Sequence, residues 1–225
     1  MIAWREIGRA SVPGENAPLV LSQHEREFVI RIGPYALMSS AAHGSEEALA
    51  ERACGRISAR ANARVLVGGL GMGFTLAAAL RRLGTGAGVI VSELIPAIVA
   101  WNRGPLAHLA SRPLDDPRVS VRESDVALVI REKEAAFDAI LLDVDNGPNG
   151  ITRTSNNWLY SFAGLHAAFR ALRGEGVLGV WSVAPDREFT RRLVEVGFGV
   201  EEEVARARRT KGGRHTLWLA TRPAR

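Results

Sequence analysis

From about residue 45 onward, apolar runs rich in β-branched residues alternate with segments that have helical patterns. This alternation predicts βαβ units and a parallel sheet, because a parallel connection needs a crossover that a helix usually supplies. The expected strands lie at 64–68, 88–92, 118–122, 137–143, 176–183, 198–205 and 214–221. Two of them, AILLDV and GVLGVW, have the continuous apolar character of strands buried on both faces. The sequence therefore predicts an α/β fold in which 198–221 forms a terminal antiparallel hairpin.

The first 44 residues have a different pattern. The runs APLVLSQ, REFVIRIG and YALMSS are short, strand-like and divided by Gly, Pro and charged residues, as in a small antiparallel β unit. A sheet of that size is seldom stable alone, so we expect it to pack on the larger domain or on a second subunit. We therefore divide the chain into an N-terminal β unit, 1–44, and a Rossmann-like domain, 45–225. The second unit opens with SEEALAERACGRISAR, for which Ser45 is the predicted helix N-cap.

Charge and cysteine content limit the classes of partner. The net charge of +5 would suit nucleic acid, but only two of the basic residues are lysines, the arginines are scattered, and acids lie between them. The basic run RARRTKGGR at 206–214 is interpreted as a solvated turn, with contact to an anionic substrate or RNA as the alternative. The single cysteine, Cys54, excludes an internal disulfide. The five histidines have no metal-ligand spacing, so no metal is predicted.

The apolar runs of the sequence allow a prediction of where the protein is located. None has the roughly 18 residues expected of a membrane span, and MIAWREIGRA has no apolar core of a signal peptide. We therefore expect a cytoplasmic protein with no membrane partner.

A glycine-rich stretch, RVLVGGLGMGFTLAAAL, joins the first long apolar strand to a helix. Its glycines Gly69, Gly71 and Gly73 lie where the carboxyl end of a strand meets a helix N-terminus, which is where doubly wound sheets bind nucleotides. The spacing is G-x-G-x-G, whereas a dinucleotide fingerprint would place its last glycine at position 74, which is Phe74. A nicotinamide or flavin cofactor is therefore disfavoured.

Carboxylates follow the next two strands. Glu93 ends VIVSE, where it would accept the two hydroxyls of a ribose; a surface glutamate is the alternative. Asp125 follows RVSVRES, where it would bind an adenine amino group, cap the helix VALVIREK, or do both. Because the carboxyl ends of parallel strands share one edge of the sheet, backbone and two carboxylates together predict an adenosine site.

The fourth strand leads into FDAILLDVDNGPNG. Asp143 is expected to point into the same crevice, where it would bind or deprotonate an amine nucleophile. Acids in such a loop also serve as turn formers, and for Asp145 and Asn146 the functional and the turn-forming roles are both open.

These motifs together resemble the spermidine synthase family, whose members are aminopropyltransferases on the class I S-adenosylmethionine-dependent methyltransferase fold. The resemblance extends over nearly the whole chain, through SEEALAE, VLVGGLGMG, VSELIP, DPRVSVRESDVALVI, FDAILLDVDNGP and LRGEGVLGVWS. It implies a seven-stranded, mostly parallel sheet of order 3-2-1-4-5-7-6, an N-terminal β unit that supports a homodimer, and a nucleoside-sulfonium ligand. It also implies that the glycine loop and Glu93 bind the nucleoside, that Asp125 lies beside the adenine, and that Asp143 is the catalytic base.

The sequence departs from the family in the parts that hold the amines. Met72 stands where the family has an acid in the glycine loop, and a thioether cannot pair with an ammonium. Leu49 and Ala50 replace a Tyr-His pair that lines the family's active site. The acceptor loop is also shorter, so that the family's second aspartate is replaced by Asn146 or displaced to Asp145.

The leading hypothesis from the sequence is a transferase that binds S-adenosylmethionine and transfers a methyl group to a small-molecule acceptor, for which an amine is one candidate. The alternative is a polyamine aminopropyltransferase that uses decarboxylated S-adenosylmethionine, and a further alternative is a non-catalytic nucleoside-binding homologue. Trp158 and Tyr160 in NNWLYSF are expected either to form an aromatic wall near the sulfonium or to pack the start of a helix.

Overall fold

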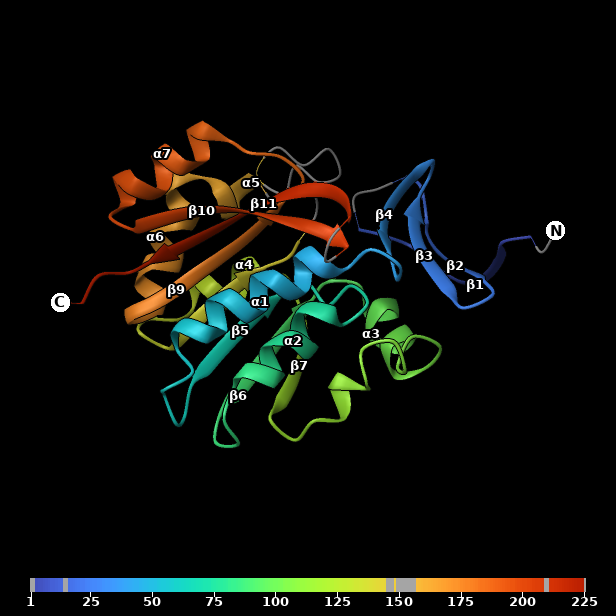
Figure 1. Cartoon of the computed structure of the whole chain (residues 1–225), viewed down its shortest axis with the longest axis horizontal. Coiled ribbons are helices and arrows are strands. Elements are labelled where there is room, and N and C mark those ends of the chain that lie inside the picture. The colour runs from blue at the N-terminus through green and yellow to red at the C-terminus, as the bar shows by residue number, and fades with distance from the viewer. Residues whose placement is uncertain (1–2, 14–15, 145–147, 149–156, 209–210, 225) are drawn as a thin grey trace.

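The computed structural model describes residues 3–13, 16–144, 148, 157–208 and 211–224. Two sheets form the frame of the molecule, a small one at one end and a large one covered by helices (Figure 1). The small sheet has four antiparallel strands in the order β1-β2-β3-β4. Its strands are β1 (Arg5–Ala10), β2 (Leu19–His24), β3 (Glu27–Ile32) and β4 (Tyr35–Ser39). The sequence pattern predicted three of them; β1 adds a fourth.

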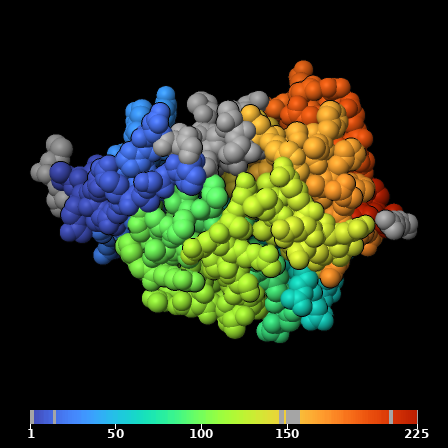
Figure 2. Space-filling model, turned by 180° about the vertical axis from the view of Figure 1, so that it is seen from behind, coloured from blue at the N-terminus to red at the C-terminus, as the bar shows by residue number. Residues whose placement is uncertain are grey.

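The small sheet packs against the large domain through apolar side chains. Leu19, Leu21 and Ile30 are fully buried and belong to the same hydrophobic cluster as the helices of the large domain. β1 lies so close to α3 (Pro96–Arg103) that a Cβ on Gly8 would stand 2.6 Å from Trp101 Nε1. Seen from behind, the blue N-terminal residues form one end of the molecule and abut the green segment around α3 (Figure 2). The small sheet is thus held in place by burial of one of its faces.

The large sheet has seven strands in the order β10-β11-β9-β8-β5-β6-β7. Five neighbouring strands, β9, β8, β5, β6 and β7, run parallel to one another. β10 and β11 form an antiparallel hairpin at the edge beside β9. The strands are β5 (Arg64–Gly68), β6 (Gly88–Glu93), β7 (Val119–Glu123), β8 (Phe137–Leu142), β9 (Leu172–Ser182), β10 (Gly199–Arg208) and β11 (Lys211–Thr221). Numbered within this sheet, the order is 3-2-1-4-5-7-6 when read from β7, which confirms the predicted fold class.

Helices cover both faces of the large sheet because side chains of each strand alternate between the faces. In β5, Val65 and Val67 pack with α1 (Gly44–Arg56), α2 (Phe74–Arg82) and α3, and Leu66 packs on the other face. The helices of that second face are α4 (Val126–Arg131), α6 (Phe162–Ala171) and α7 (Arg187–Val196), with the short α5 (Asn157–Tyr160) beside them; a single turn, η1 (Pro113–Asp115), precedes β7. None of the helices in the described residues is long and apolar enough to cross a membrane.

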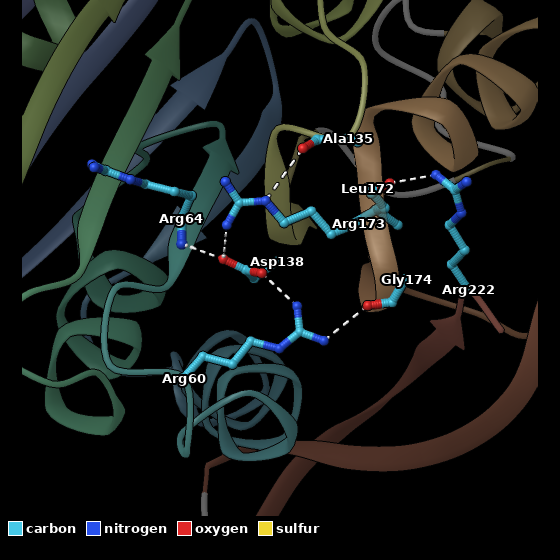
Figure 3. Close-up of polar contacts among 8 residues, drawn as sticks. All are labelled: Arg60, Arg64, Ala135, Asp138, Leu172, Arg173, Gly174 and Arg222. Atoms are coloured by element: carbon cyan, nitrogen blue, oxygen red, sulfur yellow. Dashed lines mark hydrogen bonds and ion pairs between the residues drawn. The ribbon is translucent and has the colours of Figure 1, made fainter. Parts of the chain in front are cut away.

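A buried carboxylate ties elements together at the amino end of β8. Asp138, whose side chain is 2% exposed, forms ion pairs with Arg60 and Arg173 and accepts a hydrogen bond from the backbone N–H of Arg64 at 2.7 Å (Figure 3). These partners come from the loop after α1, from β9 and from the start of β5. Because parallel strands place their amino ends at the edge opposite their carboxyl ends, Asp138 holds the frame from the side away from the predicted nucleoside site.

The start of α1 differs from the prediction. His43, not Ser45, is the N-cap residue, and it makes no side-chain capping bond. Ser45 lies inside the first turn and is fully buried, and its hydroxyl bonds the side chains of Glu46 and His215. β4 ends at Ser39 and α1 begins at Gly44, close to the proposed division at residue 44, which stays a prediction.

Candidate active site

A cavity lies between the N-terminal sheet and the carboxyl ends of β5, β6, β7 and β8. Apolar side chains of β2, β3 and β4 form one wall, and the glycine loop with the strand tips forms the other. The first turn of α1 and the end of β9 also reach it. Ligands of doubly wound sheets bind at this edge, because the loops that follow parallel strands leave a crevice there.

The glycine loop serves both the backbone and the cavity. Gly69 has a positive φ of 86°, and a Cβ on it would stand 2.4 Å from the carbonyl oxygen of Asp143, so only glycine fits beside the end of β8. Gly69 and Gly71 line the cavity. Gly73 is instead the left-handed N-cap residue of α2 and is outside the described lining, so its place in the structure is that of a helix start. The predicted nucleoside contacts of the three glycines stay predictions.

Glu93 ends β6 inside the cavity. It is 5% exposed, and its two carboxylate oxygens accept hydrogen bonds from the backbone N–H groups of Leu70 and Ile95, each at 2.9 Å. Burial raises the pKa of Glu93, and the backbone donors oppose that rise. Each oxygen has a second lone pair, so the carboxylate is oriented by the protein and still able to accept a ribose hydroxyl. The ribose contact itself stays a prediction.

Asp125 caps a helix and also lines the cavity, so its position is compatible with both roles that the sequence left open. Its Oδ1 accepts a hydrogen bond from the N–H of Ala127 at 2.8 Å, which makes it the N-cap residue of α4, and the residue lines the cavity. Because the cap uses one oxygen, the other is chemically able to accept an adenine amino group. The helix-capping role is thus observed, and the adenine role stays a prediction.

Asp143 follows β8 directly and joins the same cavity. Its N–H donates to the carbonyl of Gly68 at 3.0 Å, which continues the ladder between β8 and β5 by one residue. Its Oδ2 accepts a hydrogen bond from the Thr75 hydroxyl at the start of α2. Burial raises the pKa of Asp143 to about 6, against the opposing effect of Thr75. A carboxylate with this pKa is suited to accept a proton near neutral pH.

Glu46 is a cavity residue that the sequence interpretation missed. It lies in the first turn of α1, where an acid is favourable to the helix dipole, and it reaches the cavity that holds Asp143. Burial, followed by repulsion from Asp143, raises the pKa of Glu46 to about 7. The clue in the sequence was its position next to Ser45, within the segment that resembles the family's active-site motif.

Met72, Leu49 and Ala50, which replace polar residues of the family pattern, are buried in the structure. Met72 is 3% exposed and lines the cavity, whereas Leu49 and Ala50 are fully buried in the hydrophobic core below it. Among the described residues, the part of the wall next to the glycine loop therefore has a thioether where an acid would hold an amine.

For Trp158 and Tyr160 the sequence left an aromatic wall or helix packing open, and the structure places both rings outside the described cavity lining. Tyr160 is 3% exposed, its ring packs edge-on against Phe189, and its hydroxyl donates to the carbonyl of Val144. Trp158 stacks under the guanidinium of Arg131, with the guanidinium carbon 3.8 Å from the ring centroid. Neither belongs to the described cavity lining. The packing alternative fits Tyr160, whose ring belongs to the hydrophobic cluster on the second face of the large sheet.

Two of the described aromatic residues do line the cavity: Phe74 at the start of α2, and Trp181 near the end of β9. The sequence offered no indication of this for Trp181, because GVLGVW has the pattern of a strand buried on both faces. Asp145 and Asn146, the other two predicted substrate residues, lie outside the described residues.

The charge of the cavity is opposite to that of the chain. Four carboxyl groups line it, and the described lining residues include no Lys, Arg or His. The acids are Glu46, Glu93, Asp125 and Asp143. Within the described part of the chain, no three His, Cys, Asp or Glu side chains are grouped so as to hold a metal ion. A cationic organic ligand is the chemistry that this lining fits.

No protein-family model and no curated protein matches the sequence. Solved structures do match over nearly its whole length. A spermidine synthase from Thermotoga maritima has a TM-score of 0.77 at 19% identity, covering 98% of this chain and 74% of that one. A spermidine synthase in complex with the transition state analogue AdoDATO has a TM-score of 0.76 at 18% identity, with 98% and 73% covered.

A third match is a probable spermidine synthase from Corynebacterium glutamicum ATCC 13032, with a TM-score of 0.63 at 17% identity, covering 95% of this chain and 79% of that one. Both sheets of the present chain therefore have counterparts in these proteins, because the matched regions span nearly all of it. The resemblance inferred from the motifs is confirmed at the level of the fold: this chain is built on the fold of the spermidine synthases.

Proposed function

We propose that the chain is a transferase that binds an adenosyl sulfonium compound in the cavity and transfers an alkyl group from its sulfur to an amine. The observation that carries this proposal is the cavity lining, which has four carboxyl groups and, among its described residues, no basic side chain. A sulfonium donor and an ammonium acceptor are both cations, and buried carboxylates are stabilised by cationic partners. A phosphate-bearing cofactor would meet repulsion from the same groups.

The adenosine half of the donor is assigned to the strand tips. Glu93 would accept the ribose hydroxyls, Asp125 the adenine amino group, and the backbone at Gly69 and Gly71 would pack against the nucleoside. Leu94, Ile95 and Val126 supply apolar surface around this position, as a purine ring requires.

Aminopropyl transfer from decarboxylated S-adenosylmethionine is the reaction that we favour. It is the reaction type of the spermidine synthases, whose fold this chain has, and it uses an amine acceptor that suits Asp143. In the reaction, the lone pair of a neutral amine attacks the carbon attached to sulfur, the new N–C bond forms, and the C–S bond breaks with its electron pair left on sulfur. The products are methylthioadenosine and an ammonium whose extra proton passes to the Asp143 carboxylate.

Methyl transfer from S-adenosylmethionine is the second candidate, and Met72 favours it. An aminopropyl donor carries a primary ammonium on its tail, and the buried thioether of Met72 offers that group no acceptor of charge-assisted strength. The same carboxylate, Asp143, would then orient or deprotonate the acceptor. The two candidates share the nucleoside site and differ in the tail of the donor.

Calorimetric titration of the purified chain with three compounds tests the proposal. They are S-adenosylmethionine, decarboxylated S-adenosylmethionine and methylthioadenosine, compared in one buffer. We expect all three to bind, with the decarboxylated donor bound more tightly than the carboxylated one, because the carboxylate would face Glu46 and Asp143. The opposite preference would favour methyl transfer, and failure of all three to bind would refute the nucleoside site.

A further inference from the structure

The glycine loop at one wall of the cavity has no carboxylate that could bind an amine, and the first turn of α1 supplies a carboxylate to the same cavity. Met72 leaves the glycine loop without a carboxylate, and Leu49 and Ala50 withdraw the next turn of α1 into the core. Glu46, one turn earlier on α1, is the acidic residue of that helix that lines the cavity.

The orientation of Glu46 is fixed by a chain of hydrogen bonds. The Ser45 hydroxyl lies 2.6 Å from Glu46 Oε2 and 2.8 Å from His215 Nδ1 on β11. A hydroxyl has one proton, so when Glu46 is ionised Ser45 donates to the carboxylate and accepts from His215. This assigns the Nδ1–H tautomer to His215. Burial lowers the pKa of His215, which keeps the ring neutral and leaves the carboxylate charge uncompensated.

The neighbouring acid on the same turn shows the contrast. Glu47 forms an ion pair with Arg81 at 3.1 Å, and its other carboxylate oxygen lies 3.5 Å from His43 Nδ1. Among the ion pairs of the described residues, none includes Glu46, and of the charges that act on its pKa, Asp143 has the largest effect. Two carboxylates that repel each other in a cavity without a basic side chain are complementary to a cation that lies between them or beside one of them.

A second feature of the same end of the cavity indicates a ligand. Trp181 is 8% exposed, lines the cavity, and packs with its ring 4.6 Å from that of His215. Its buried Nε1 has no acceptor among the described residues. Leaving a buried donor unpaired is unfavourable, so this end of the cavity is better explained as a polar binding surface than as protein packing.

We propose that Glu46 determines acceptor specificity by binding the protonated amino group of a diamine, whose other, neutral nitrogen attacks the donor beside Asp143. This inference rests on the proposed function, since it assumes a donor in the adenosine half of the cavity. It places an anionic contact for the acceptor in the first turn of α1, in a cavity whose glycine loop has Met72 and no carboxylate. Ser45 and His215 are positioning residues, which act on the acceptor through Glu46.

The experiment measures diamine binding to the full chain saturated with methylthioadenosine, with Glu46→Gln as the variant and Glu47→Gln as the matched control. The probes are 1,3-diaminopropane, 1,4-diaminobutane and 1,5-diaminopentane, and n-butylamine is the monoamine that lacks the second ammonium. For the diamine that binds most tightly, we expect Glu46→Gln to weaken binding by about 10-fold or more, as for a lost charge-assisted bond. n-Butylamine should lose little, and Glu47→Gln should leave all probes unchanged.

Methylthioadenosine affinity separates this inference from the proposed function, because Glu46 lies in the acceptor half. If methylthioadenosine does not bind the native chain, the proposed function fails. If it binds but the diamines do not, or if Glu46→Gln affects diamine and monoamine alike, the assignment of Glu46 is wrong. Weaker binding of decarboxylated S-adenosylmethionine with unchanged diamine binding would also overturn it, since Glu46 would then hold the donor's amine.

A pH profile gives a readout that loss of fold would not reproduce. The charged and titratable groups facing Glu46 are Asp143 across the cavity, Glu47 on its own turn and His215 on β11. Diamine binding to the native chain should strengthen as pH rises from 5 to 8, because the cation needs the carboxylates ionised. In Glu46→Gln this rise should be smaller, with thermal unfolding used to check that the variant is folded. An unchanged rise would count against the proposal.

Discussion

The carboxylate of Glu93 is the part of the site for which a structural prediction can be made most sharply. Its two oxygens accept hydrogen bonds from the N–H groups of Leu70 and Ile95, both at 2.9 Å, in a position that is 5% exposed. Glu93→Gln keeps the volume and replaces one acceptor oxygen with an NH₂ group. One of the two backbone donors then faces another donor instead of an acceptor.

The magnitude follows from the number and kind of bonds lost. One charge-assisted hydrogen bond contributes about 1.5–3 kcal/mol, so the chain should lose roughly that much free energy of unfolding. If the same carboxylate also accepts a ribose hydroxyl, methylthioadenosine affinity should fall by a further factor of about 10 to 100. Chemical denaturation measures the first quantity and isothermal titration calorimetry the second.

A thermodynamic cycle distinguishes a ribose contact from a loop that has merely been loosened. The native chain should bind the 2′-deoxy analogue of methylthioadenosine less tightly than methylthioadenosine itself, by about 10-fold for one lost charge-assisted bond. Glu93→Gln should discriminate much less between the two ligands, because the acceptor of that hydroxyl is weakened. Equal discrimination by the native chain and the variant would refute the ribose assignment, even if both affinities fell.

Further predictions concern the base, the pH dependence of stability, the frame and the assembly. Asp143→Asn should abolish turnover and leave methylthioadenosine affinity nearly intact; unchanged turnover would remove Asp143 from the mechanism. The pKa of Glu46 is raised from 4.5 to about 7, and that of Asp143 from 3.8 to about 6. At pH values between the unfolded and the native pKa of each group, the ligand-free native chain therefore binds more protons than the unfolded chain. Their contribution to stability is therefore present below about pH 4 and lost as pH rises to 7, and urea denaturation of Glu46→Gln should show a flatter loss than the native chain. Asp138→Ala should lower the free energy of unfolding by about 2–4 kcal/mol, since it removes the buried carboxylate that Arg60, Arg173 and a backbone N–H share; a loss under about 0.5 kcal/mol in denaturant titration would contradict that estimate. The homodimer stays a prediction, and sedimentation equilibrium should give twice the mass of 24.3 kDa, with a monomer at micromolar concentration as the contrary result.

The fold was predictable because its indications are local. Continuous apolar runs, helical periodicity and glycines at a strand end identify each βα unit from neighbouring residues alone, and strand order then follows from the resemblance. The same locality brought together Gly69, Glu93, Asp125 and Asp143, since residues that end parallel strands must meet at one edge of the sheet.

The tertiary structure decided which residues from other elements complete the cavity. Glu46 reaches it from α1, and its position cannot be derived from strand ends because it depends on how that helix packs on the sheet. Trp181 lies near the end of β9, but the continuous apolar pattern of that strand does not show which of its side chains faces the cavity. The same packing turned Ser45 from an expected helix cap into a partner of His215, and placed Tyr160 in the core and not in the site. Local sequence determined the strand-end groups of the cavity, to which we assign the nucleoside. The end that we assign to the acceptor depends on side chains that long-range packing brings together, so only the folded chain reveals it.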